Sequence, residues 1–192
     1  MGKSFTSQIR DNYSLYTDLL NNRKSTDESN IDISTVKSSN RNFLINDDVL
    51  LNHITLSQKI IFISEVKIRN YKDFKFKIRC VSLCDPPLFR YDSDGPAHQN
   101  HDENIPLKEQ SITTPHFHNF NERGIEIAYK TNQLLNDASR AALEDINLCV
   151  VHFCHEGNIR VGENDFPSVS ILSKTLGLPL LENDPNSGVN FI

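Results

Sequence analysis

The fold is decided by the stretch Asp73-Phe74-Lys75-Phe76-Lys77-Ile78-Arg79-Cys80, in which apolar and basic side chains alternate. Successive side chains of a β-strand point to opposite faces of its sheet, so this alternation gives one buried face and one basic face. The pattern predicts a half-buried strand over residues 73–84. The pair Pro86-Pro87 ends it, because proline has no N–H to donate to a neighbouring strand.

Further strands are expected on both sides of this stretch. The segments rich in β-branched and aromatic residues are 42–45 and 49–56, joined by a turn at Asp47-Asp48, then 59–69 and 88–92, and a hairpin of 115–120 with 125–129. Residues 11–23 and 137–155 are expected to form helices, since their apolar residues recur at helical spacing. Together these elements predict an α+β fold: a mainly antiparallel sheet with an N-terminal helix and a long C-terminal helix packed on it.

The length of 192 residues suits one domain with an extension. We expect a single α+β domain over residues 1–159 and a C-terminal extension over residues 160–192, with a short docking helix from Phe166 and a loose tail. Residues 24–40 are rich in Ser, Asn, Asp and Thr and lack an apolar period, which predicts a mobile loop. Residues 93–114 form a second long polar segment, and loops of this length are often functional or disordered.

The composition narrows the class of protein. The net charge of −5 argues against sequence-independent binding to nucleic acid, which depends on neutralising phosphates. No apolar run approaches the roughly 18 residues that span a bilayer, and residues 1–6 hold no apolar core of a signal peptide. These features predict a cytoplasmic protein without a membrane partner. The cysteines, Cys80, Cys84, Cys149 and Cys154, are then expected to be reduced and buried.

Histidines gather in the middle third of the chain. His98 lies in the polar segment, and His116 and His118 follow it in the tetrapeptide Pro-His-Phe-His. Residues two apart on a strand project from the same face, so His116 and His118 share a face. Arg90 and Asp92 share a face of their own strand for the same reason. The sequence predicts a site at which these groups converge.

Acid–base cleavage of RNA is the chemistry that these residues suit best. Imidazole titrates near neutral pH, so His116 and His118 can share the work of taking and giving a proton. Arg90 would hold the phosphate with its planar guanidinium, and His98 would position the substrate. Further candidates for substrate binding are Asp92, Asn100, Arg123 and Tyr129. This chemistry needs no metal and no cofactor.

Two other interpretations stay open. His98, His116 and His118 are the ligands expected of a metal site, although the sequence has no fixed spacing to a further ligand. In a purely structural interpretation, a histidine beside a proline bonds a backbone carbonyl, and Arg90 and Asp92 form a salt bridge on one strand face.

The motifs resemble those of an uncharacterised family of small bacterial and phage proteins. They are Leu88-Phe89-Arg90-Tyr91-Asp92, Gly95-Pro96-Ala97-His98-Gln99-Asn100 and Pro115-His116-Phe117-His118. Phe153-Cys154 and Asn158-Ile159 also look like the C-terminal end of that family, and the likeness covers residues 67–159. No established activity comes with this family.

A more distant likeness is to TumE-type toxins of toxin–antitoxin modules, which place an Arg-Tyr-Asp strand ahead of a Pro-His-His loop and a second Pro-His-rich segment. The chain departs from that pattern, because Gln99 follows His98 and a polar insertion precedes Pro115. The resemblance implies a toxin- or defence-type protein that acts on RNA and has an antitoxin or another protein as partner. Our leading hypothesis is therefore a metal-independent ribonuclease. The alternative is a non-catalytic binding module, in which residues 93–118 bind a nucleotide, a protein partner or a metal.

Overall fold

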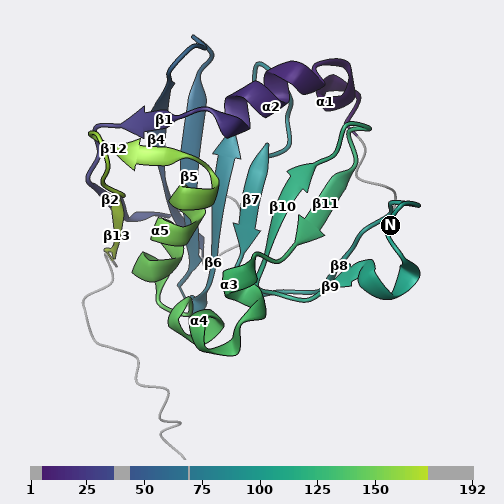
Figure 1. Cartoon of the computed structure of the whole chain (residues 1–192). Coiled ribbons are helices and arrows are strands. Elements are labelled where there is room, and N and C mark those ends of the chain that lie inside the picture. Colours follow the sequence, from purple (N-terminus) through teal and green to yellow (C-terminus); the bar gives the residue numbers. More distant parts are fainter. Residues whose placement is uncertain (1–5, 37–43, 69, 173–192) are drawn as a thin grey trace, which may run out of the picture.

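A large sheet dominates the computed structural model, which describes residues 6–36, 44–68 and 70–172 (Figure 1). Its strand order is β11 (Glu126–Tyr129), β10 (His116–Phe120), β7 (Phe89–Asp92), β6 (Asn70–Arg79), β5 (Ile60–Lys67), β4 (Leu44–His53), β1 (Lys24–Thr26) and β12 (Ile159–Val161), and β3 (Thr35–Val36) also pairs with β4. Neighbouring strands are antiparallel, except that β1 and β12 run parallel. A mixed fold with a mainly antiparallel sheet is therefore confirmed.

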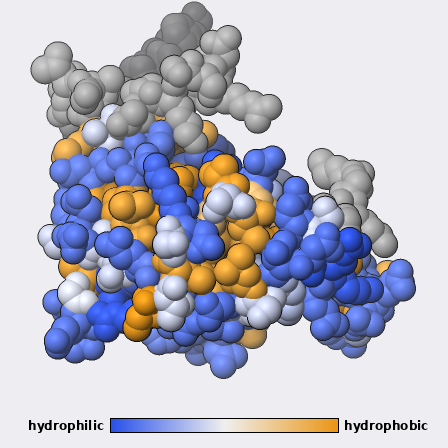
Figure 2. All heavy atoms as spheres, turned by 90° about the horizontal axis from the view of Figure 1, so that it is seen from above, coloured by the Kyte–Doolittle hydropathy of each residue, from blue (hydrophilic) through white to orange (hydrophobic). Residues whose placement is uncertain are grey.

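Helices cover one face of this sheet and one of its ends. Helix α5 (Ile146–Glu156) crosses the face, with α3 (Asn132–Leu135) and α4 (Asp137–Ala142) near it (Figure 1). Helices α1 (Ser7–Asp11) and α2 (Tyr13–Asn21) lie at the upper end, and α2 corresponds to the helix expected over residues 11–23. Seen from that end, apolar residues reach the surface in patches among polar ones (Figure 2). Outside the large sheet, β2 (Asn30–Ile33) pairs with β13 (Ser168–Ile171), and β8 (His98–Gln99) pairs with β9 (Ser111–Ile112), which follows the short helix η1 (Leu107–Glu109).

The core lies between the sheet and α5. Phe74, Phe76 and Ile78 of β6 are buried, as their alternation with basic residues predicts. Phe153 of α5 stacks on Phe89 of β7 with the ring centroids 5.1 Å apart, and its ring lies 5.5 Å from that of Phe76. Burial of such aromatic side chains contributes about 1.5–3 kcal/mol each. Because side chains alternate along a strand, the residues between these core positions project from the opposite face of the sheet.

The prediction of one long C-terminal helix over residues 137–155 is wrong. The chain forms two helices there, because it leaves the helical conformation between α4 and α5. The carboxylate of Asp145 accepts hydrogen bonds from the backbone N–H groups of Asn147 at 2.8 Å and Leu148 at 3.1 Å. This N-cap satisfies donors that have no partner inside the helix and fixes the residue at which α5 begins. The apolar residues keep their helical spacing across this break, so the sequence pattern does not reveal it.

Residues 24–36, predicted to belong to a mobile loop over residues 24–40, instead form β1, β2 and β3, and residues 37–40 lie outside the described residues. The partner strands lie far along the chain, since β1 pairs with β12 and β2 pairs with β13. Ile31 and Ile33 alternate with exposed polar residues and are buried. Residues 160–171, assigned to the C-terminal extension, contain the end of β12 and the whole of β13. The docking helix expected from Phe166 is replaced by β13, and residues 173–192 lie outside the described residues.

Strand β4 also differs from the expectation of two short strands with a turn between them. It runs through Asp47 and Asp48, which pair with Ser64 and Ile63 of β5. A continuous ladder with β5 thus overrides the local turn preference of two consecutive aspartates.

All four cysteines are free and buried, as predicted. Among the described residues, no helix is long and apolar enough to cross a membrane.

Candidate functional site

Strands β7 and β10 lie side by side and carry most of the predicted site. Their antiparallel register places Asp92 opposite His116 and Arg90 opposite His118. Phe117, between the two histidines, packs into the core. Both histidines therefore project from the other face of the sheet, and they contact Asp92 and Arg90 there. The prediction that His116 and His118 share a face is confirmed.

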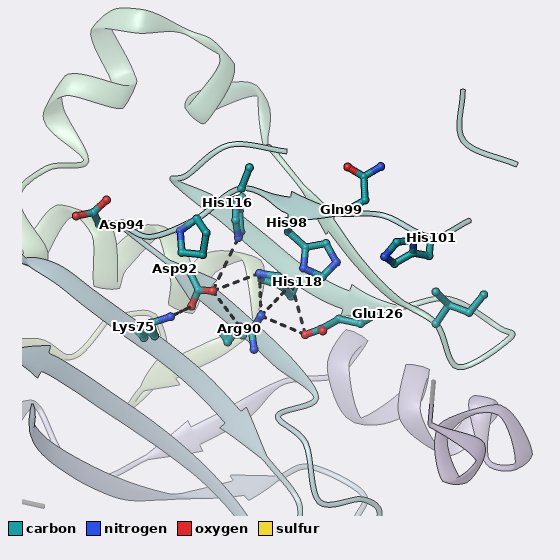
Figure 3. Close-up of a pocket in the computed structure, with 13 residues that line it drawn as sticks. Lys75, Arg90, Asp92, Asp94, His98, Gln99, His101, His116, His118 and Glu126 are labelled. Atoms are coloured by element: carbon teal, nitrogen blue, oxygen red, sulfur yellow. Dashed lines mark hydrogen bonds and ion pairs between the residues drawn. The ribbon is translucent and has the colours of Figure 1, made fainter. Parts of the chain in front are cut away.

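These side chains form one wall of a pocket of about 600 Å³ (Figure 3). The residues that line it are Lys75, Arg90, Asp92, Asp94, Pro96, Ala97, His98, Gln99, His101, His116, His118, Ile125 and Glu126. The predicted catalytic residues Arg90, His98, His116 and His118 thus converge from β7, β8 and β10, together with Asp92. A volume of this size falls within the roughly 300–1,000 Å³ that is typical of small-molecule sites.

Asp92 is the anionic centre of the pocket. Its Oδ2 lies 3.4 Å from His118 Nε2, 3.8 Å from His116 Nε2 and 3.3 Å from Arg90 Nε. Its Oδ1 lies 3.2 Å from the ammonium of Lys75. Burial alone would raise the pKa of the Asp92 carboxyl, but the hydrogen bond from His118 and the charges of Arg90 and Lys75 outweigh burial and hold that pKa far below its ordinary value. Asp92 is therefore a stable carboxylate.

His118 is held on three sides. Its Nε2 faces Asp92, and its Nδ1 lies 3.4 Å from Oε1 of Glu126. Nη2 of Arg90 lies 3.2 Å from Nδ1 and 3.0 Å from Nε2 of the same ring. An atom so nearly equidistant from both ring nitrogens sits over the ring and not in its plane, as expected of a guanidinium stacked on an aromatic face. Because Nη2 also lies 3.3 Å from Glu126 Oε1, ring and guanidinium fix each other's orientation.

His116 and His98 surround the ring of His118. The ring centroids of His116 and His118 are 4.6 Å apart, and those of His98 and His118 are 4.7 Å apart. Burial, and then the neighbouring His118, lower the pKa of His116 to about 4 against the opposing charge of Asp92. Burial and His118 also lower the pKa of His98. A neutral imidazole offers one nitrogen lone pair, so these two rings can accept a proton or bind a metal ion.

Asn100, a predicted binding residue, anchors the polar segment to the sheet. Its side-chain amide donates to the carbonyl of Ala128 at 2.8 Å and accepts from the N–H of Ala128 at 2.7 Å. Its backbone N–H donates to the carbonyl of Gln110 at 2.7 Å. These bonds to the edge strand β11 and to the segment itself hold residues 93–114 in place and, with them, His98. The side chain of Asn100 does not line the pocket.

Arg123 and Tyr129, the other predicted binding residues, also lie away from the pocket. The guanidinium of Arg123 is paired with the carboxylate of Asp102, so it joins the turn between β10 and β11 to the polar segment. Tyr129 stacks on Phe117 at 5.8 Å between ring centroids, on the core side of the sheet. The structure therefore does not bring these two side chains to the site.

The pocket holds three charged residues that the sequence does not predict for the site: Lys75, Asp94 and Glu126. The sequence pattern predicts only that Lys75 lies on the basic face of its strand and that Glu126 belongs to a hairpin strand. The register of β6 on β7 pairs Lys75 with Asp92 directly. Glu126 follows from the hairpin: His118 pairs with Ala128, and a residue two positions before Ala128 lies on the same face. The register of the hairpin, together with alternation along β11, therefore places Glu126 in the pocket.

The pocket offers two kinds of chemistry. Four histidines, a guanidinium and an ammonium meet three carboxylates in the pocket, which suits proton transfer on an anionic substrate. Ligand atoms of Asp92, His116 and His118 all lie within 4.8 Å of one another, and so do those of His98, His118 and Glu126. Either set could hold a metal ion.

Comparison with known proteins gives no relative from which to infer a function. No family model, curated protein or solved structure matches the chain significantly.

Proposed function

We propose that this pocket cleaves RNA by acid–base catalysis without a metal ion. The observation that carries the proposal is the convergence of Arg90, His98, His116 and His118, from separate segments, in one pocket. Such convergence is what the chemistry of RNA cleavage requires, because a base, an acid and a cation must reach one phosphodiester together.

In the proposed reaction, one imidazole of the pair His116 and His118 takes the proton of the RNA 2′-hydroxyl. The 2′-oxygen then forms a bond to phosphorus while the bond between phosphorus and the 5′-oxygen breaks. The other imidazole gives its proton to the departing 5′-oxygen, and the products are a 2′,3′-cyclic phosphate and a free 5′-hydroxyl. The ring centroids of His116 and His118 are 4.6 Å apart, so both imidazoles can reach one phosphate group.

Arg90 holds the phosphate in this proposal. Its guanidinium has five N–H donors in a fixed plane and binds phosphate oxygens with two of them. Asp92 and Glu126 contact the same guanidinium and orient it. Lys75 adds a second positive charge beside Asp92. His98, on the polar segment, faces His118 and positions the substrate.

An activity of this kind fits a toxin or a defence-type protein that acts on cellular RNA. The likeness of the Arg-Tyr-Asp and Pro-His-Phe-His motifs to those of toxins supports this role. An antitoxin or another protein partner would block the activity by covering the pocket.

The test is a cleavage assay on a short fluorescent RNA in buffer that contains EDTA. We expect His116→Ala and His118→Ala each to slow cleavage by about 10²–10⁴-fold, the contribution typical of a positioned general acid or base. His155→Ala is the matched control, because His155 is 63% exposed and lies outside the pocket. Equal cleavage by all four proteins, or no cleavage by the wild type, would sink the proposal.

A further inference from the structure

Three potential ligand atoms in the pocket are separated by distances close to those between the ligand atoms of a bound metal ion. With bonds of about 2.0–2.1 Å, neighbouring ligand atoms around a tetrahedral zinc ion are about 3.3 Å apart. In the structure, Asp92 Oδ2 lies 3.4 Å from His118 Nε2 and 3.8 Å from His116 Nε2. The ligand atoms of all three residues lie within 4.8 Å of one another.

We propose that the pocket binds one divalent ion of the zinc class through Asp92, His116 and His118. The site is the one used in the proposed function, and the inference goes beyond that function by assigning it a second ligand. Two imidazoles and one carboxylate are a ligand set that suits Zn²⁺ and neighbouring transition metals. A fourth position would face the pocket and take water.

The positions of these ligands favour a preformed site. Asp92 and His116 are direct partners across β7 and β10, and His118 is two residues from His116 on the same strand. All three residues are buried. The second candidate set replaces two of them with His98, which is only partly buried on the two-residue strand β8, and Glu126. Both sets need His118, and the fully buried set on β7 and β10 is the more rigid of the two.

Arg90 is the competitor of this ion. Its Nε lies 3.3 Å from Asp92 Oδ2, the oxygen that would bind the metal, and its Nη2 lies over the ring of His118. A metal ion therefore has to displace a positive charge from Asp92, while Arg90 can keep its contact with Glu126. Lys75 binds the other carboxylate oxygen and can stay.

Binding of a metal ion to His116 and His118 should inhibit RNA cleavage. A bound ion occupies nitrogen lone pairs of both His116 and His118, and these are the lone pairs that proton transfer needs. Zinc would thus hold the protein in an inactive form.

The experiment is a titration of EDTA-stripped, dialysed protein with Co²⁺, followed by visible absorption, and then displacement by Zn²⁺. We expect one ion per chain. His116→Ala and Asp92→Asn should each weaken binding by more than about 100-fold, since even residues behind the ligands cost 10–100-fold in affinity. His98→Ala should keep the site, as should the exposed control His155→Ala. Circular dichroism of each variant establishes that it is folded.

Arg90→Met separates this inference from the proposed function. It removes the competing charge and keeps an unbranched side chain, so it should bind Co²⁺ more tightly than the wild type while RNA cleavage is lost. Absence of stoichiometric binding, or binding that survives both His116→Ala and Asp92→Asn, would overturn the metal site and leave cleavage in EDTA unaffected. Failure of cleavage in EDTA by a protein that binds one Co²⁺ would overturn the proposed function alone.

Discussion

His118 and Asp92 face each other across β10 and β7, with Nε2 of the imidazole 3.4 Å from Oδ2 of the carboxylate. The contact joins two neighbouring strands on the face opposite the aromatic core. It gives a buried histidine a fixed direction, and it keeps a buried carboxylate ionised beside Arg90 and Lys75. A fixed imidazole and an ionised carboxylate are both needed in a pocket where protons are transferred between defined atoms.

Replacement of Arg90 by lysine should lower kcat/KM for RNA by about 100-fold, as is typical when a positioned donor to a developing charge is removed. Lysine keeps the charge but lacks the planar fork that contacts Asp92, Glu126 and the His118 ring at once. Steady-state kinetics on the fluorescent RNA measure this. Arg140→Lys, at a surface ion pair with Asp137, is the control and should be silent. An Arg90→Lys enzyme with unchanged kinetics would exclude Arg90 as the phosphate ligand.

Replacement of Asn100 by leucine should destabilise the fold by about 2–4 kcal/mol, because two buried backbone groups of Ala128 lose their partners. It should also raise KM, since the segment that carries His98 loses its anchor on β11. Urea unfolding and steady-state kinetics measure the two effects. The same change at Gln133, an exposed residue of α3, should alter neither. A stable Asn100→Leu variant with normal KM would show that the anchor is dispensable.

Lys24 is fully buried, and its ammonium donates to the carbonyls of Leu19, Leu20 and Asn22 at 2.7, 3.0 and 2.8 Å. These carbonyls lie at the C-terminal end of α2, where helix carbonyls lack partners inside the helix. Lys24→Met should therefore cost about 3 kcal/mol in the free energy of unfolding. Lys108→Met, at an 82% exposed side chain, is the control. Equal stability of the two variants in urea would refute the capping role.

Lys24 also predicts a dependence of stability on pH. Burial lowers its pKa from the ordinary 10.5 to about 7. Between these two values the unfolded chain binds more protons than the folded chain, so the free energy of unfolding should rise with pH in this window. Urea unfolding at several pH values should show this contribution in the wild type and not in Lys24→Met. Identical pH slopes for the two proteins would contradict it.

The part of the site that could be predicted from the sequence is the part set by alternation along single strands. Arg90 with Asp92, and His116 with His118, follow from strand parity, which is a local property. Lys75 and Glu126 could not be assigned in the same way, because their places depend on the register between strands. Asn100 has a polar side chain of the type found in binding sites. Its structural role becomes visible only from its hydrogen bonds to the neighbouring strand β11.

In the fold, too, the elements set by a local pattern could be predicted and those set by distant partner strands could not. The buried face of β6 and the hairpin of β10 and β11 are visible in the local pattern. The strands β1 and β2 are not, because their partners β12 and β13 lie at the other end of the described chain. The break before α5 depends on a single capping side chain, Asp145, within a continuous apolar period.

The most direct test of the central claim uses an oligonucleotide that is DNA except for one ribonucleotide, incubated with the wild-type protein in EDTA. Acid–base attack by a 2′-hydroxyl predicts one cut, on the 3′ side of the ribonucleotide, which leaves a 2′,3′-cyclic phosphate identifiable by mass spectrometry. An intact oligonucleotide, or cleavage of an all-DNA control, would contradict the account.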